Sequence, residues 1–271
     1  MAQCKLVALD LDGTLTNSEK VLPKKNKDAI FKLQERGVKV VLASGRPTYG
    51  IMHLAKELNL QEFGGYIVAY NGSFIIECST GKRISSTLFP RELLPQIESV
   101  AKQLNVEPLT YDDPTDTILA KTSDNKWIQH EAWLNNNMAL RIVESLNDSA
   151  PMNIPKCLMV GDPNHMGKVE PQVRELFPMI DVYRSSPFFL EIVPKGIDKA
   201  NSLETLSRII GIRQEEMAAF GDGHNDINMI KYAGWGIAMS NACDEAKNIA
   251  DFISLSNDEC GVAHAIKELG L

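Results

Sequence analysis

Two aspartates follow a short apolar run near the start of the sequence, in the segment Leu-Asp-Leu-Asp-Gly-Thr-Leu over residues 9–15. The run over residues 6–9 is typical of a buried strand, and in extended backbone residues two apart point to the same side. Asp10 and Asp12 can therefore converge on one site at the carboxyl end of that strand, where open α/β sheets bind their ligands. Because adjacent carboxylates repel, one takes up a proton unless a cation keeps both charged.

A second acidic segment, Phe-Gly-Asp-Gly-His-Asn-Asp over residues 220–226, also follows an apolar strand and opens a helix. Asp222 lies at the strand end, and Asn225 and Asp226 enter the first helical turn. In a parallel sheet this arrangement places a third and a fourth carboxylate beside the first pair. Such an oxygen-rich cluster suits Mg²⁺, which takes octahedral oxygen ligands at about 2.0–2.1 Å. His224 is interpreted as solvent-facing or locally hydrogen-bonded, because imidazole is a poor ligand for a hard metal.

Two further strand ends offer groups for an anion. Ser44 and Gly45 stand between a predicted strand and a helix, so a hydroxyl and free N–H groups form an anion-binding corner. Lys199 falls early in a predicted helix, where the helix dipole disfavours a cation, and a broken local rule suggests function. Lys195 competes with Lys199 for this role, and the participation of Arg46 stays open.

Each segment also has a structural interpretation without chemistry. The aspartates at residues 10 and 12 can form an acidic loop, Asp226 can satisfy a helix dipole, and Ser44 can be a plain N-cap. A calcium-binding loop is excluded, because that loop needs Gly at its sixth position and Glu at its twelfth. Counted from the first aspartate, Gly13 stands fourth and Val21 twelfth.

Alternating strand and helix signals surround these segments. The first third of the chain reads as βαβαβ, which predicts a parallel sheet with helices on its faces. The same rhythm returns after residue 188, beginning with a predicted strand over 189–193. Hairpin signals and mixed elements over 83–187 predict an α+β insertion. The fold class is therefore α/β, with a discontinuous sheet domain over 1–82 and 188–271.

The composition excludes several classes of protein. Of 271 residues, 44% are apolar and 23% charged, which is typical of globular domains and excludes disorder. A net charge of −7 lacks the basic footprint of a nucleic-acid binder. No apolar run approaches the ~20 residues of a membrane span, and residues 1–6 do not resemble a signal peptide. Five scattered cysteines without a Cys-x-x-Cys pair indicate reduced thiols and a cytoplasmic location.

Together, four strand ends supply carboxylates, a hydroxyl, a cation and a metal site, which is the equipment for phosphoryl transfer. The sequence resembles the haloacid dehalogenase superfamily, and within it the Cof-type phosphatases, over nearly its whole length. The matching motifs are Asp-Leu-Asp-Gly-Thr-Leu at 10–15, Ser-Gly-Arg at 44–46, Lys199 and Gly-Asp-Gly-His-Asn-Asp at 221–226, with a recurring Asn-Gly turn at 71–72. The sequence departs from the usual pattern at Ala200, where Gly is common, and at Gly223, where Asn is common.

The resemblance implies a Rossmann-like core with an inserted α+β cap over 83–187 that sets substrate specificity. It implies that Asp10 is the nucleophile and that Asp12 is first the general acid and then the base. Mg²⁺ would bind Asp10, the backbone carbonyl of Asp12, and Asp222, while Asp226 would orient the metal ligands from behind.

By the same resemblance, Ser44, Gly45, Lys199 and Asn225 hold the phosphate. The predicted function is Mg²⁺-dependent hydrolysis of small phosphorylated metabolites, such as sugar phosphates, through an aspartyl phosphate. Two alternatives stay open: a phosphomutase, which returns the phosphoryl group to a sugar, and a non-catalytic sensor of phosphorylated metabolites. No nucleic-acid or membrane partner is expected.

Overall fold

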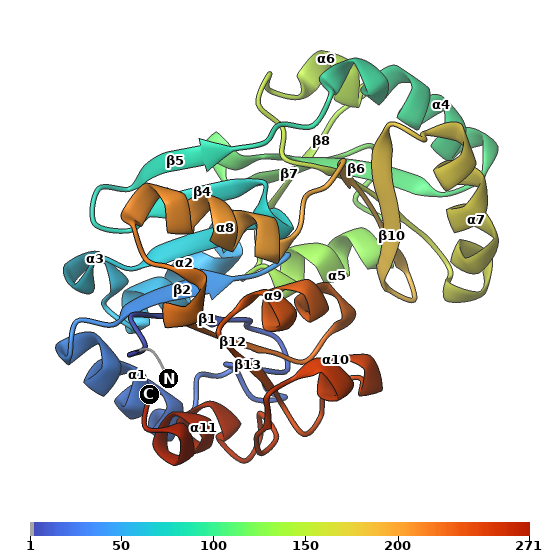
Figure 1. Ribbon diagram of the computed structural model, residues 1–271. Coiled ribbons are helices and arrows are strands. Elements are labelled where there is room, and N and C mark those ends of the chain that lie inside the picture. Colours follow the sequence, from blue (N-terminus) through green and yellow to red (C-terminus); the bar gives the residue numbers. More distant parts are fainter. Residues whose placement is uncertain (1–2) are drawn as a thin grey trace. The chain divides into compact units, whose positions relative to one another are not determined.

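A computed structural model describes residues 3–271, and its backbone contacts divide the chain into two compact units. The core unit comprises the residues up to Gly45, then Ile51–Ser86 and Asp198–Leu271. The insert unit comprises Thr87–Ile197 together with Arg46–Gly50. Each unit has its own sheet, as Figure 1 shows, and each is described here by itself.

The core unit contains an eight-stranded sheet in the order β14-β13-β12-β1-β2-β3-β4-β5. All neighbours from β14 to β3 pair in parallel, and only β4 and β5 run antiparallel at one edge. The predicted α/β class is thereby confirmed. The strands are β1 (Leu6–Leu9), β2 (Lys39–Ala43), β3 (Tyr66–Ala69), β4 (Phe74–Glu77), β5 (Lys82–Ser86), β12 (Met217–Gly221), β13 (Trp235–Ala238) and β14 (Phe252–Ile253).

Helices cover this sheet because its strands are apolar on both faces. Alternate residues of a strand point to opposite faces, and Leu6 and Ala8 of β1 pack in one buried cluster with Leu203 and Met229 from two of the helices. The helices are α1 (Lys24–Glu35), α2 (Thr48–Glu57), α3 (Leu60–Phe63), α8 (Lys199–Ile210), α9 (Ile227–Tyr232), α10 (Asp244–Ile249) and α11 (Gly261–Leu269), with 3-10 turns η1 (Tyr70–Gly72), η4 (Gln214–Glu216) and η5 (His224–Asp226).

The insert unit is built on a six-stranded mixed sheet in the order β10-β11-β9-β6-β7-β8. Its strands are β6 (Glu107–Asp112), β7 (Thr117–Ala120), β8 (Ala139–Ile142), β9 (Cys157–Val160), β10 (Ile180–Ser186) and β11 (Phe189–Pro194). Its helices are α4 (Leu94–Gln103), α5 (Lys126–Leu134), α6 (Leu146–Ser149) and α7 (Pro163–Leu176), with turns η2 (Arg91–Leu93) and η3 (Asp113–Thr115).

The boundaries of the two units differ from the sequence prediction at both ends of the insertion. The prediction counted the strand over 189–193 with the core, and this placement is wrong: β11 pairs antiparallel with β10 and β9 of the insert sheet. At the other end, β5 pairs with β4 of the core sheet, although residues 83–86 were predicted to belong to the insertion. A short apolar run indicates a strand but carries no information on which neighbour it pairs with.

A buried polar network lies within the insert unit and was not expected from the sequence. The Lys156 Nζ is 2.8 Å from Glu191 Oε2, and these side chains are only 2% and 6% exposed. Nearby, Glu131 Oε1 accepts hydrogen bonds from the Tyr111 hydroxyl and the Asn135 amide, both at 2.7 Å. Buried polar groups are tolerated when they are paired in this way, so the network is a source of specific structure in this unit.

No helix within residues 3–271 combines the length and the apolar character needed to cross a lipid bilayer.

Replacing Lys156 with Met should destabilise the protein by about 3–5 kcal/mol, because Glu191 is then left as a buried charge without its partner. The matched control is Lys24→Met, which removes an exposed pair with Asp28; this change should cost less than ~0.5 kcal/mol. Urea unfolding of both variants measures the difference. Equal costs for the two substitutions would contradict the structural role of the buried pair.

A second prediction concerns the pH dependence of stability. Burial raises the pKa of Glu131 above its ordinary value, although Lys156 and the Tyr111 hydrogen bond oppose the change. A carboxyl whose pKa is higher in the folded state loses stabilisation as the pH rises from its unfolded pKa through its folded pKa. The stability of Glu131→Gln relative to wild type should therefore increase with pH above about 4.3. Urea unfolding at pH 4.5 to 8 tests this, and a difference that stays constant or decreases would contradict it.

Candidate active site

The parallel register of the core sheet brings the predicted functional segments to one edge. Leu9 of β1 lies beside Leu42 of β2 on one side and beside Phe220 of β12 on the other. The residues that follow these strands therefore emerge together: Asp10 after β1, Ser44 after β2 and Asp222 after β12. Sequence positions more than 200 residues apart meet here because parallel strands end at the same edge.

Three carboxylates form a compact cluster at this edge. Oxygen atoms of Asp10, Asp222 and Asp226 all lie within 4.8 Å of one another. Burial raises the pKa of Asp10 well above its usual range, and the charge of Asp226 raises it further. Burial also raises the pKa of Asp222 to about 6. The carboxylates of the cluster therefore repel one another when ionised, and a bound cation would reduce this repulsion.

Lys199 supplies one cation from the first residue of α8. Its Nζ lies 2.6 Å from Asp10 Oδ1 and 2.6 Å from Asp226 Oδ1, and the side chain is fully buried. Burial alone would lower the pKa of Lys199, but Asp10 and Asp226 outweigh it and raise the pKa above its ordinary value. The ammonium is thus charged and fixed between two anions. Lys195, the competing lysine of the sequence analysis, is exposed, and its Nζ faces the Pro178 carbonyl at 3.4 Å.

Asp226 uses both of its carboxylate oxygens in holding the loop after β12. Its Oδ2 accepts hydrogen bonds from the backbone N–H groups of Asp222 and Gly223, at 3.0 and 2.9 Å, while its Oδ1 faces Lys199. The side chain is 1% exposed. Asp226 therefore fixes the position of Asp222, and both of its carboxylate oxygens accept hydrogen bonds from the protein.

The turn after β1 adds a contact to Asp222 that the sequence analysis did not assign. The Thr14 hydroxyl donates to Asp222 Oδ1 at 2.7 Å. Gly13 has φ of +85°, and a Cβ built there would lie 2.3 Å from Asp222 Oδ2. The absence of a side chain at Gly13 thus lets the turn approach the carboxylate closely.

Asp12 stands apart from the three-carboxylate cluster in its contacts. Its Oδ1 pairs with the Lys20 Nζ at 2.7 Å, and about a third of its side chain is exposed (35%). Lys20 adopts a positive φ of 63°, which the sequence gave no reason to expect. The side chain of Asp12 is thus in contact with solvent, unlike that of Asp10, which is 6% exposed.

Ser44, Gly45 and Asn225 are connected through Asn71, which lies in η1 after β3. The Asn71 backbone N–H donates to the Ser44 carbonyl at 2.9 Å, and the Asn225 amide donates to Asn71 Oδ1 at 3.1 Å. A Cβ at Gly45 would lie 3.0 Å from the Asn71 amide nitrogen. The Asn-Gly turn at 71–72 was the only sequence signal for this link, and its Asn has a left-handed φ of 56°.

The donor set fits a hard divalent cation. Asp10 and Asp222 offer carboxylate oxygens. Within the part of the chain that the structure describes, Asp10 Oδ1 accepts a hydrogen bond from Lys199 and Asp10 Oδ2 accepts none. The Lys199 ammonium pairs with two of the three clustered carboxylates, so the cluster has more acidic than basic groups. Oxygen ligands and excess negative charge are what Mg²⁺ requires, whereas Zn²⁺ favours nitrogen and sulfur.

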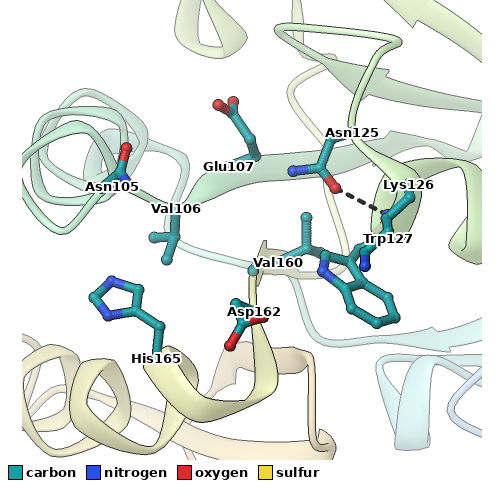
Figure 2. A pocket seen from close by; sticks show the side chains of 10 residues that line it. Asn105, Val106, Glu107, Asn125, Lys126, Trp127, Val160, Asp162 and His165 are labelled. Atoms are coloured by element: carbon teal, nitrogen blue, oxygen red, sulfur yellow. Dashed lines mark hydrogen bonds between the residues drawn. The ribbon is translucent and has the colours of Figure 1, made fainter.

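A separate cavity of about 430 Å³ lies within the insert unit, at the starts of α5 and α7 (Figure 2). Three of its polar side chains have structural partners. Asn125 caps α5 by accepting from the Trp127 N–H, Asp162 caps α7 by accepting from the Asn164 N–H, and His165 contacts the Leu104 carbonyl.

Aromatic and basic side chains of the insert unit also have partners within that unit. Trp127 stacks on Phe188 with ring centroids 4.2 Å apart, and His130 stacks on Trp133 at 5.5 Å. Arg141 donates to the Ser149 carbonyl at 2.9 Å.

The chain is similar to known hydrolases over nearly its whole length. The sequence profile of the haloacid dehalogenase-like hydrolases matches residues 7–266. YxeH of Bacillus subtilis is 34% identical over 271 residues, and the match covers 98% of each chain. YcsE of the same organism, named a 5-amino-6-(5-phospho-D-ribitylamino)uracil phosphatase, is 31% identical over 263 residues, or 97% of this chain and 94% of that one. The crystal structure of a haloacid dehalogenase-like hydrolase from Bacteroides thetaiotaomicron has a TM-score of 0.93 at 45% identity, covering 98% of this chain and 100% of that one.

Gly13→Ala should disrupt the carboxylate cluster, because the new methyl group displaces Asp222. Gly37→Ala is a matched control: Gly37 has the same φ of +85°, but nothing lies within 4 Å of its Cβ position. Both variants bear the left-handed backbone cost of about 1–2 kcal/mol. Only Gly13→Ala should also lose Mn²⁺ affinity at the cluster, by at least ~10-fold. Titration of Mn²⁺ by electron paramagnetic resonance measures this, and equal affinity in the two variants would refute the contact.

Proposed function

We propose that this protein hydrolyses small phosphorylated metabolites with Mg²⁺ through an aspartyl phosphate on Asp10. The chain belongs to the haloacid dehalogenase-like hydrolases and is a phosphoric monoester hydrolase of that family. The observation that carries the proposal is the contact of the buried Lys199 ammonium with both Asp10 and Asp226. This contact fixes one Asp10 oxygen and leaves the other as the attacking atom.

In the first step, the Asp10 Oδ2 attacks phosphorus and the bond from phosphorus to the leaving oxygen breaks. The leaving oxygen takes a proton from Asp12, so a neutral alcohol departs. In the second step, water attacks phosphorus while Asp12 takes a proton from it, and the bond between Asp10 and phosphorus breaks. Inorganic phosphate leaves and Asp12 is protonated again, so the cycle closes.

The side chain of Asp12 is partly exposed rather than buried in the cluster, so it can exchange protons. Its ion pair with Lys20 favours the ionised form, so Asp12 would have to leave Lys20 before it acts as an acid. Asp10, in contrast, is buried and held by Lys199, as a nucleophile that must be positioned should be. The two aspartates of one strand end thus have environments that separate their roles.

Asp10 and Asp222, with the backbone carbonyl of Asp12, would hold Mg²⁺, and Asp226 would keep Asp222 in place. When bound, the ion would neutralise charge on the phosphoryl oxygens and on the clustered carboxylates. Lys199 is already charged within the cluster and would face the phosphoryl group from the other side. Ser44, the Gly45 N–H and Asn225 would donate hydrogen bonds to the remaining phosphoryl oxygens.

A relative's name supports our proposal for the substrate class. YcsE, by its name, acts on a phosphorylated ribityl compound, which supports a sugar phosphate or related metabolite as the substrate here. We place specificity for the leaving group in the insert unit, in the role of a cap, and the enzyme in the cytoplasm, where five free cysteines stay reduced.

Asp10→Asn should lower turnover of p-nitrophenyl phosphate with Mg²⁺ by at least ~10³-fold, because an amide is a poor nucleophile. Asp12→Asn should lower it by about 10²–10⁴-fold through loss of the acid and base. Asp28→Asn is the control, since Asp28 is an exposed residue of α1 that forms a surface ion pair with Lys24. Unchanged turnover in Asp10→Asn would refute the assignment, and isomerisation of a sugar phosphate without phosphate release would identify a mutase.

A further inference from the structure

A second cluster of metal-binding side chains lies in the core unit, beside the loop that carries Asp222 and Asp226. It consists of His224, Cys243 and Glu245, whose donor atoms all lie within 4.8 Å of one another. We propose that these three residues bind a divalent transition-metal ion, Zn²⁺ or one of similar ligand preference, at a site separate from the carboxylate cluster.

The backbone holds the three residues in place before any ion binds. His224 begins η5 after β12, and Cys243 directly precedes α10 after β13, two parallel neighbours with Gly221 beside Ala238. The Cys243 N–H donates to the Asp222 carbonyl at 2.9 Å, which joins the two loops. Their relative position is therefore set by sheet register and by a hydrogen bond, not by the side chains themselves.

The donor types select the ion. An imidazole nitrogen, a thiolate sulfur and a carboxylate oxygen match the ligands of Zn²⁺, whereas Mg²⁺ takes oxygen ligands. Tetrahedral coordination with bonds of roughly 2.0–2.3 Å places donor atoms about 3.3–3.8 Å apart. Since the donors already lie within 4.8 Å of one another, small side-chain rotations bring them to that spacing.

The three side chains are available for a ligand. Within residues 3–271, none of these side chains takes part in a hydrogen bond or ion pair, whereas the Asp226 carboxylate accepts three hydrogen bonds. His224 and Glu245 are exposed and Cys243 is partly buried, so an ion can enter directly from solvent. With three protein ligands, water completes the fourth position, as in open zinc sites.

The site shares its loop with the proposed catalytic residues. His224 lies two residues after Asp222 and two before Asp226, and Cys243 bonds to the Asp222 backbone. An ion bound to His224 and Cys243 therefore links η5 to α10 and stabilises the loop conformation seen here. An ion that binds only the folded state raises thermal stability in proportion to its occupancy.

Titration of the reduced full-length protein with Co²⁺ tests the proposal, because thiolate ligation produces a near-ultraviolet charge-transfer absorption that oxygen ligands do not give. Wild type should show this absorption at one equivalent, and Zn²⁺ should abolish it because Zn²⁺ binds more tightly than Co²⁺. Excess Mg²⁺, which occupies oxygen sites, should leave it unchanged. The readout needs no phosphatase activity, so it succeeds or fails independently of the proposed function.

The variants assign the ligands. Cys243→Ser should lose the absorption, and His224→Gln and Glu245→Gln should each weaken Co²⁺ binding at least ~10-fold. Cys260→Ser is the matched control, since it removes another partly buried thiol of the core unit outside the cluster. Circular dichroism checks that each variant is folded. No absorption in wild type, absorption that persists in Cys243→Ser, or loss in Cys260→Ser would overturn the proposal.

Discussion

The buried contact of Lys199 with Asp10 and Asp226 is the interaction on which the core unit's site depends. It joins the end of β1, the start of α8 and the loop after β12. In the sequence, Lys199 is 189 residues from Asp10 and 27 residues from Asp226. A fully buried ammonium is tolerated only because two carboxylates surround it, and the ammonium in turn opposes the burial and the Asp226 charge that raise the pKa of Asp10. Each charge is thus a condition for burying the others.

The cluster has more carboxylates than ammonium groups. Three carboxylates share one ammonium, and both burial and mutual repulsion raise the pKa values of Asp10 and Asp222. Local stability alone would favour fewer acids at this position, so the excess charge is a mark of function rather than of folding. Asp226 stays in place beside these charges because its Oδ2 accepts hydrogen bonds from two backbone N–H groups.

The insert unit uses buried charge differently. Lys156 and Glu191 balance one to one, and Glu131 is satisfied by a phenol and an amide rather than by a second cation. Each of these carboxylates has a hydrogen-bond or ion-pair partner, and the network fixes the packing of the unit.

The sequence by itself determined the α/β class and the strand ends at which Asp10, Ser44 and Asp222 emerge, because apolar runs and the turns after them are local features of the chain. Tertiary structure alone decided the sheet to which β11 belongs, and it decided that Lys199 is buried and Lys195 exposed. It also decided which side chains meet at the site: Lys20 with Asp12, Thr14 with Asp222, and Asn71 with Asn225. It also decided the Lys156–Glu191 pair and the meeting of His224 with Cys243. These contacts depend on which strands pair and in what register, and that choice is made by the packing of the whole chain.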